Sequence, residues 1–184
     1  MDDIVKQALA KWPNVPDCYG WLGLDARGNW YMRDDSSQAA GPFAPDDGGS
    51  LASKGSLLRH DKLIDFIQRN YAADAGGQWF FQNGPQRVYV ELQATPLVWR
   101  VEAGPGFDVT AHTGQTARVQ RCLLDEKGHL YLETDLGFGL MHTSDMDRAG
   151  DAVQQGLWVP QDVRAGELPK RFGYVRSPQL LQKT

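Results

Sequence analysis

The chain has 184 residues, of which 41% are hydrophobic and 23% charged, so it can bury a core as one domain or as two small ones. Its net charge of −4 at pH 7 argues against a surface that binds nucleic acid in general. No stretch approaches the ~18 apolar residues of a membrane span, and two cysteines are too few for a disulfide framework.

The N-terminal segment predicts a short helix over residues 2–11. Asp2 and Asp3 favour its N-terminal end, and Pro13 ends it. The same acidic start does not fit a basic secretory leader, so we expect a cytoplasmic protein with reduced cysteines and no membrane partner. Helical spacing places five apolar residues on one face, which we expect to pack on a sheet. They are Ile4, Val5, Ala8, Leu9 and Trp12.

A short motif occurs three times along the chain. Residues 25–31, 74–80 and 125–131 each begin with Asp, carry Gly three positions later and end on Tyr or Phe. Asp accepts hydrogen bonds from nearby backbone amides, and Gly takes the positive φ that other residues resist, so the motif predicts a hairpin bend. The starts at 25, 74 and 125 are 49 and 51 residues apart, which indicates an internal repeat and a duplicated domain.

The first half of the chain predicts a sheet and one strong helix. Leu63, Ile64, Ile67 and Tyr71 recur with helical period, and Asp61 can cap that helix. Segment 34–55 is rich in Ser, Ala, Gly, Pro and Asp, so we expect a long loop that is either a lid over a site or an inert insertion. The expected elements are strands at 18–24, 30–33, 55–60, 79–82, 87–92 and 97–101 and the helix at 61–70.

The second half repeats this style after the turn at 104–106, where we place the division between domains 1–103 and 104–184. Ser144 and Asp147 have capping-box spacing for a helix over 144–155. The predicted class is α+β, with antiparallel sheets that each pack against a helix. The expected strands are 107–111, 117–124, 130–133, 138–142 and 158–160, followed by a tail that docks on the body.

Residues 25–99 resemble an uncharacterised bacterial family, domain of unknown function 1285. The shared elements are the motifs at 25–31 and 74–80, Arg59 before an amphipathic helix, and Thr95-Pro-Leu-Val98. The resemblance implies duplicated domains, each an antiparallel sheet wrapped about a helix, with a second half loosely like a pleckstrin-homology barrel. It also implies a ligand site between the halves and a role in signalling. The insertion 38–54 departs from the family pattern and indicates a sibling family.

Motifs that specify chemistry are absent from the sequence. The four histidines have no metal-binding spacing, and no nucleophile elbow, P-loop or dinucleotide fingerprint occurs. Segment 145–156 imitates a calcium loop but has Gly156 where a bidentate Glu is needed. We therefore expect no catalytic residue, metal or cofactor. His129 replaces Asn29 and Gln78 of the other motif copies, which favours a polar turn residue over a ligand.

The candidate binding residues are basic or aromatic. Arg59, His60, Arg87, Trp99 and His142 could line a cleft where arginine holds a phosphate or carboxylate and an aromatic ring stacks on a base. Alternatively, the tryptophan is a core residue, the arginines pair with surface carboxylates and His142 only begins a helix. The first hypothesis is a non-enzymatic module for a small anionic or nucleotide-like ligand or a protein partner. The alternative is an enzyme that uses His60 or His142 with a carboxylate.

Overall fold

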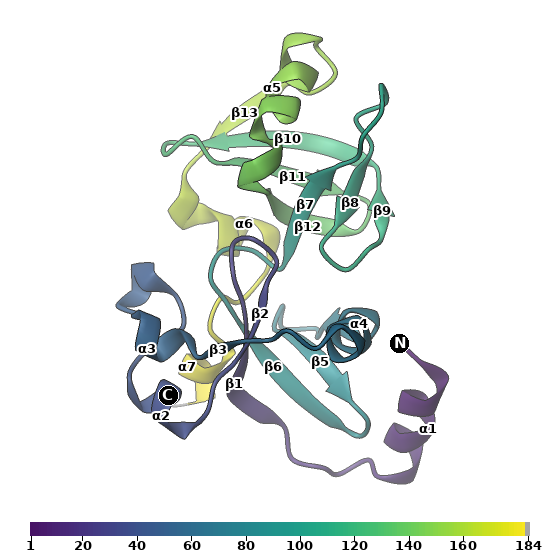
Figure 1. Ribbon diagram of the computed structural model, residues 1–184, viewed down its shortest axis with the longest axis vertical. Helices are drawn as coiled ribbons and strands as arrows, with labels where there is room; N and C mark the ends of the chain where they lie inside the picture. The colour runs from purple at the N-terminus through teal and green to yellow at the C-terminus, as the bar shows by residue number, and fades with distance from the viewer. Residues whose placement is uncertain (183–184) are drawn as a thin grey trace. The chain divides into compact units, whose positions relative to one another are not determined.

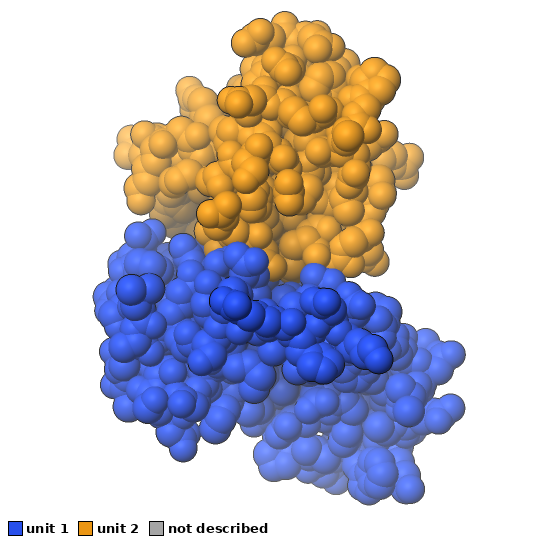
Figure 2. All heavy atoms as spheres, viewed as in Figure 1, with its two compact units in different colours: residues 1–25, 29–94, 174–184 blue, residues 26–28, 95–173 orange. Residues whose placement is uncertain are grey.

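The computed structural model describes residues 1–182, which divide into two compact units (Figures 1 and 2). Unit 1 contains residues 1–25, 29–94 and the segment from Tyr174 onward. Unit 2 contains residues 26–28 and 95–173. Each unit holds one curled sheet with helices, so the predicted α+β class is confirmed. No helix within the described residues has the length and apolar character that crossing a membrane requires.

Unit 1 is built on a six-stranded sheet in the order β3-β2-β1-β6-β5-β4. β1 and β6 run parallel and the other neighbours antiparallel. Side chains on both faces of this sheet are buried, and on one face Phe66 of helix α4 packs edge-on against Phe81 at 5.5 Å between ring centroids. The strands are β1 (Cys18–Leu24), β2 (Trp30–Met32), β3 (Ser56–Leu57), β4 (Tyr71–Ala73), β5 (Trp79–Asn83) and β6 (Gln86–Leu92).

The helices of unit 1 include both predicted helices, with two differences. α4 begins at Asp61 as expected, but its N-cap is His60, whose Nδ1 accepts a hydrogen bond from the Leu63 amide at 3.3 Å. On α1, only Val5 is buried, so the expected packing of its whole apolar face is wrong. The helices are α1 (Asp3–Lys11), α2 (Asp35–Ala39), η1 (Pro45–Asp47), α3 (Leu51–Lys54), α4 (Asp61–Arg69) and α7 (Pro178–Gln182).

Segment 34–55, expected as a loop, contains the three short helices α2, η1 and α3. Asp34 caps α2 by accepting from the Ser37 amide at 2.8 Å. Ser50 and Ser53 form a reciprocal capping box at α3. Some of the polar residues that favoured a loop prediction are thus helix caps, because Ser and Asp side chains satisfy the free amides of a first helical turn.

Unit 2 is built on a seven-stranded sheet in the order β13-β10-β11-β12-β7-β8-β9. β10 pairs in parallel with β13, and β12 with β7. Its strands are β7 (Leu97–Val101), β8 (Val109–Ala111), β9 (Thr116–Ala117), β10 (Val119–Asp125), β11 (Leu130–Thr134), β12 (Gly137–Met141) and β13 (Pro160–Val163). Its helices are η2 (Thr143–Asp145), α5 (Met146–Gln154), η3 (Ala165–Glu167) and α6 (Leu168–Phe172).

The two sheets share one strand order. Strands β1 to β6 of unit 1 correspond in turn to β7 to β12 of unit 2, and β13 is an addition beside β10. One backbone hydrogen bond also repeats in both units. The Gln93 amide donates to the Leu24 carbonyl and the His142 amide to the Trp99 carbonyl, both at 2.9 Å. The shared strand order makes the two halves similar, as a duplicated domain predicts.

The units differ from the predicted division at three points, one of which is that residues 26–28 belong to unit 2. β7, which we placed before the boundary at residue 103, pairs with β12 in the sheet of unit 2. The tail from Tyr174 onward belongs to unit 1, where the Val175 amide donates to the Gly77 carbonyl at 3.0 Å. Unit 1 is therefore discontinuous in sequence.

The three repeated motifs form three equivalent bends, between β1 and β2, β4 and β5, and β10 and β11. In each, Oδ1 of Asp accepts from the amide four residues later, at 2.9 Å for Asp25, 2.9 Å for Asp74 and 2.8 Å for Asp125. The glycines have φ of 82°, 78° and 81°. The expected hairpin chemistry is confirmed at all three sites.

Candidate functional site

The three predicted binding residues of unit 1 have different surroundings in the structure. Arg59 is exposed, and His60 caps α4. Arg87 is also exposed, and its guanidinium carbon lies 4.8 Å from the ring centroid of buried Phe80. Of these three residues, Arg87 therefore has the aromatic neighbour that we expected of a ligand site.

The predicted binding residues of unit 2 lie together, inside the fold. Trp99 is fully buried, and its indole N–H donates to the Leu132 carbonyl at 3.1 Å. His142 is 7% exposed and caps η2, because its Nδ1 accepts from the Ser144 amide at 3.1 Å. The core and helix-cap alternatives account for both residues.

Next to His142, an ion pair joins β7 to the start of α5. The Arg100 guanidinium donates to Asp145 at 2.5 Å, and the Val101 amide donates to the same carboxylate at 3.1 Å. The hydrogen bond from Arg100 lowers the pKa of Asp145 against the effect of burial. This cluster stabilises the fold of unit 2, and its hydrogen bonds occupy the Asp145 carboxylate.

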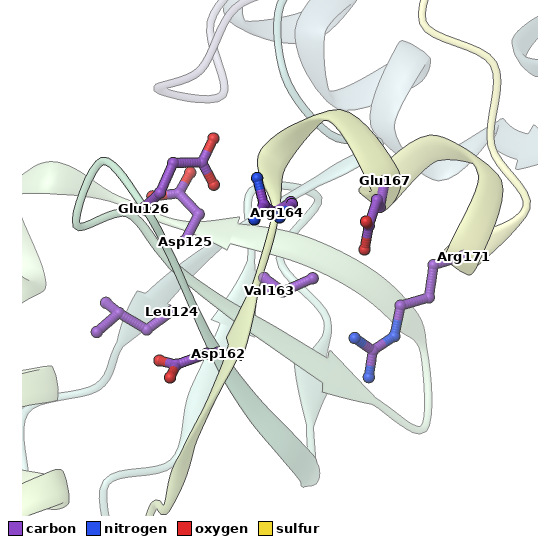
Figure 3. Close-up of a pocket in the computed structure, with 8 residues that line it drawn as sticks. All are labelled: Leu124, Asp125, Glu126, Asp162, Val163, Arg164, Glu167 and Arg171. Carbon is purple, nitrogen blue, oxygen red and sulfur yellow. The ribbon is translucent and has the colours of Figure 1, made fainter.

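A pocket of about 480 Å³ opens in unit 2 where β10 and β13 end (Figure 3). Strand β10 pairs in parallel with β13 here, so their carboxyl ends meet at one edge of the sheet. The η3–α6 segment continues from β13 and supplies the remaining wall. The lining residues are Leu124, Asp125, Glu126, Asp162, Val163, Arg164, Glu167 and Arg171.

Two of the four carboxylates that line the pocket accept hydrogen bonds from other residues of the protein. Asp125, whose side chain is fully buried, accepts from His129 and from the Tyr131 hydroxyl at 2.9 Å. Burial acts to raise the pKa of Asp125, but these hydrogen bonds outweigh it and the pKa lies below the usual value. Glu126 accepts from the Ala165 amide at 3.0 Å, which lowers its pKa.

The other four charged side chains of the pocket are exposed. They are two carboxylates and two guanidinium groups, and no ion pair joins any of them to another within residues 1–182. The apolar residues of the lining are Leu124 and the largely buried Val163. The four are Asp162, Arg164, Glu167 and Arg171.

His129 and Asp125 form a His–carboxylate pair beside this pocket, with 3.0 Å between Nδ1 and Oδ2. In the other two bends, the Asn29 and Gln78 side-chain amides donate to the equivalent aspartates at 3.2 and 3.3 Å. The His129 imidazole makes the same contact to Asp125 that a side-chain amide makes to the aspartate of each other bend. The pair therefore stabilises a bend, which fits the expectation of a polar turn residue at His129. No group of three or more His, Cys, Asp and Glu in the described part of the chain is arranged to hold a metal ion.

Sequence reasoning missed this pocket. Its residues come from 124–126, which the sequence predicts as part of a hairpin bend, and from 162–171, which it predicts as a tail. One signal was available, since Asp162, Arg164, Glu167 and Arg171 alternate in charge within ten residues. That pattern is also typical of a solvated surface, so it does not predict a site alone.

Comparisons with known proteins identify a family and a fold. The sequence model of family DUF2944, described as "Protein of unknown function (DUF2946)", matches residues 1–179. A DUF1285 family protein from Silicibacter pomeroyi has a similar structure, with 16% identity and a TM-score of 0.50 over 82% of this chain and 84% of that one. A DUF1285 family protein from Shewanella baltica is 15% identical, with a TM-score of 0.45 over 71% of this chain and 91% of that one. A comparison with curated proteins found no match.

Proposed function

We propose a function from the geometry of unit 2 for this chain, which belongs to family DUF2944 and, as the resemblance implied, shares its fold with a DUF1285 protein. The protein is a non-enzymatic module that binds a small polar molecule in the pocket at the ends of β10 and β13. This proposal keeps the cytoplasmic setting expected from the sequence, which the two free cysteines favour. It replaces the expected nucleotide with a smaller, non-aromatic ligand.

The observation that carries the proposal is the set of four exposed, mutually unpaired charged side chains around one concave surface. A volume of about 480 Å³ suits a small ligand, since such pockets usually measure ~300–1,000 Å³. Charged groups of both signs give such a ligand fixed points for its orientation.

The lining favours binding over catalysis. The eight pocket residues include no His, Cys, Ser, Thr, Tyr or Lys, so the lining offers no side chain of the usual nucleophile or base types except carboxylates. The two carboxylates with a lowered pKa already bind protein groups, Asp125 inside the bend and Glu126 at the Ala165 amide. The enzyme alternative therefore has less support here than a binding role.

The test is a nuclear magnetic resonance titration of the full chain with a panel of small polar metabolites. We expect at least one compound to shift the side-chain signals of Arg164 and Arg171, and Arg171→Gln to weaken that compound. Arg118→Gln is the matched control, because Arg118 is an exposed arginine of unit 2 that pairs with Asp135 outside the pocket. A panel without any shift at the pocket would refute the proposal.

A second candidate concerns Arg87 and keeps the anionic, aromatic ligand of the first hypothesis. Tyr19 stacks on Tyr89 with 4.6 Å between centroids and 4° between planes, and Arg87 lies over Phe80 on the neighbouring strand. An exposed guanidinium beside stacked rings suits a phosphate next to an aromatic base. Titration with adenosine monophosphate tests this: Arg87→Gln should abolish shifts at Tyr19, and absence of such shifts in the wild type contradicts it.

A further inference from the structure

The unit 2 pocket also indicates the chemical class of its ligand. We propose that it takes a small zwitterion, an ammonium and a carboxylate on a short aliphatic body, of the kind that free aliphatic amino acids represent. This inference rests on the proposed function, and it specifies which polar molecule the pocket selects.

The charge balance of the pocket carries the first step. The lining has four carboxylates and two guanidinium groups, which would favour a cation if all were available. Asp125 is held by the bend and Glu126 by the Ala165 amide. The side chains left to contact a ligand are then two carboxylates and two guanidinium groups, so a ligand with charge of only one sign would leave one kind without a partner. A ligand with one charge of each sign satisfies both sets.

The second step is that the available charges do not neutralise one another. Glu167 and Arg171 have i,i+4 spacing, at which opposite charges commonly pair on a helix. No ion pair forms between them in the described chain, and the Arg171 guanidinium lies 5.5 Å from the ring centroid of Phe172. Figure 3 shows Glu167 and Arg171 extending from the η3–α6 segment, with Asp162 on β13.

The third step is the character of the rest of the lining. Leu124 and Val163 are its apolar residues, and none of the eight is aromatic. A planar base would have no stacking partner, whereas a short aliphatic chain would have a matching surface. Arginine binds carboxylate in bidentate fashion, so Arg171 takes the carboxylate of the ligand. Glu167, whose side chain faces the same space in Figure 3, takes its ammonium.

Three probes with the same leucine side chain separate the charges. L-leucine carries both charges, L-leucine methyl ester only the ammonium, and N-acetyl-L-leucine only the carboxylate. Dissociation constants come from titrating the Arg164 and Arg171 side-chain signals of the full chain. We expect the ester and the acetyl derivative each to bind about tenfold more weakly than leucine, because each loses a charge-assisted hydrogen bond.

Two variants test which side chain binds each charged group of the ligand. In Arg171→Gln, leucine and its methyl ester should bind within about twofold of each other, since the carboxylate loses its partner. In Glu167→Gln, leucine and N-acetylleucine should converge in the same way. The control Arg118→Gln, made outside the pocket, should keep the discrimination of the wild type.

The outcomes separate the two proposals. If the ester or the acetyl derivative binds the wild type as tightly as leucine, or if Arg171→Gln keeps the full discrimination, the zwitterion is wrong. If leucine has no effect but another small molecule shifts the pocket signals, the zwitterion is wrong and the binding module stands. If no small molecule shifts these signals, both are wrong.

Discussion

At the scale of single residues, Arg33 is the centre of unit 1. Its side chain is completely buried and donates to three backbone carbonyls, those of Ser53 at 2.8 Å, Gly20 at 3.2 Å and Gly41 at 2.6 Å. Burial lowers the pKa of Arg33, and nearby Glu91 acts in the opposite direction. The planar guanidinium can reach all three carbonyls at once, which joins β1 to α3 and to the residue that follows the C-cap of α2.

Arg33→Met should therefore lower the free energy of unfolding of unit 1 by at least about 3 kcal/mol, because it leaves three carbonyls without their donor. Arg33→Lys should recover only part of this, since one ammonium does not reproduce the fork. Native-state hydrogen exchange measures the effect for each unit separately. Arg59→Met, at an exposed arginine of the same unit, is the control and should change little.

Asp34 provides a pH dependence at the same scale. Hydrogen bonds from the Ser37 side chain and amide, and from the Ser36 hydroxyl, lower the pKa of Asp34 to about 2. The unfolded-state pKa of Asp is about 3.9. A lowered pKa in the folded state means that the contribution to stability is complete above pH ~4 and is lost as the pH falls toward the folded pKa.

We expect the exchange protection of α2 to decrease between pH ~4 and ~2 in the wild type. Asp34→Ala should already have low protection at neutral pH and should lack this step. Asp35→Ala, which removes the neighbouring carboxylate, should keep it. A wild-type profile that stays flat across this range would contradict the assignment of Asp34 as a titrating N-cap.

At the scale of elements, the three Asp–Gly bends and the small helices of segment 34–55 depend on glycine in different ways. Gly128 has φ of 81°, and a Cβ added there would contact nothing within 4 Å. Gly55 has φ of 83°, but its Cβ would lie 2.3 Å from the Met32 carbonyl oxygen. Backbone strain is common to both positions, and a steric clash is added only at Gly55.

Gly128→Ala should cost about 1–2 kcal/mol of stability in unit 2, the price of a left-handed conformation for alanine. Gly55→Ala should cost about 3 kcal/mol or more in unit 1, because backbone must move as well. Hydrogen exchange compares the two variants with the wild type. Equal costs would show that packing around Gly55 relaxes more easily than its contacts indicate.

At the scale of the whole molecule, the two units share a strand order but not a chain layout. Unit 2 is nearly continuous, whereas unit 1 is completed by the segment after Gly173. There the Leu92 amide donates to the Arg176 carbonyl at 2.8 Å, and the buried Glu91 carboxylate accepts from the Gln179 amide at 2.9 Å. The C-terminal segment is thus an integral part of the first sheet's packing.

We expect residues 95–173 to fold alone and residues 1–94 to fail. Without the C-terminal segment, the Glu91 carboxylate loses two hydrogen-bond donors, at a cost of several kcal/mol if it stays buried. Joining Ala94 to Tyr174 through a short Gly-Ser linker should restore the fold of unit 1. Dispersed amide spectra distinguish folded from unfolded fragments, and a folded fragment 1–94 would contradict the role of the C-terminal segment.

The sequence by itself determined the elements that depend on near neighbours. The bends at Asp25, Asp74 and Asp125 close through contacts within five residues, and the helix at 61–69 follows from local periodicity. Tertiary structure alone decided which residues form the pocket, because Asp125 and Asp162 meet only when β10 pairs with β13. It also decided that Arg33 is buried and that β7 joins the second sheet. The physical reason is that burial and strand pairing depend on partners distant in the sequence, which local composition does not encode.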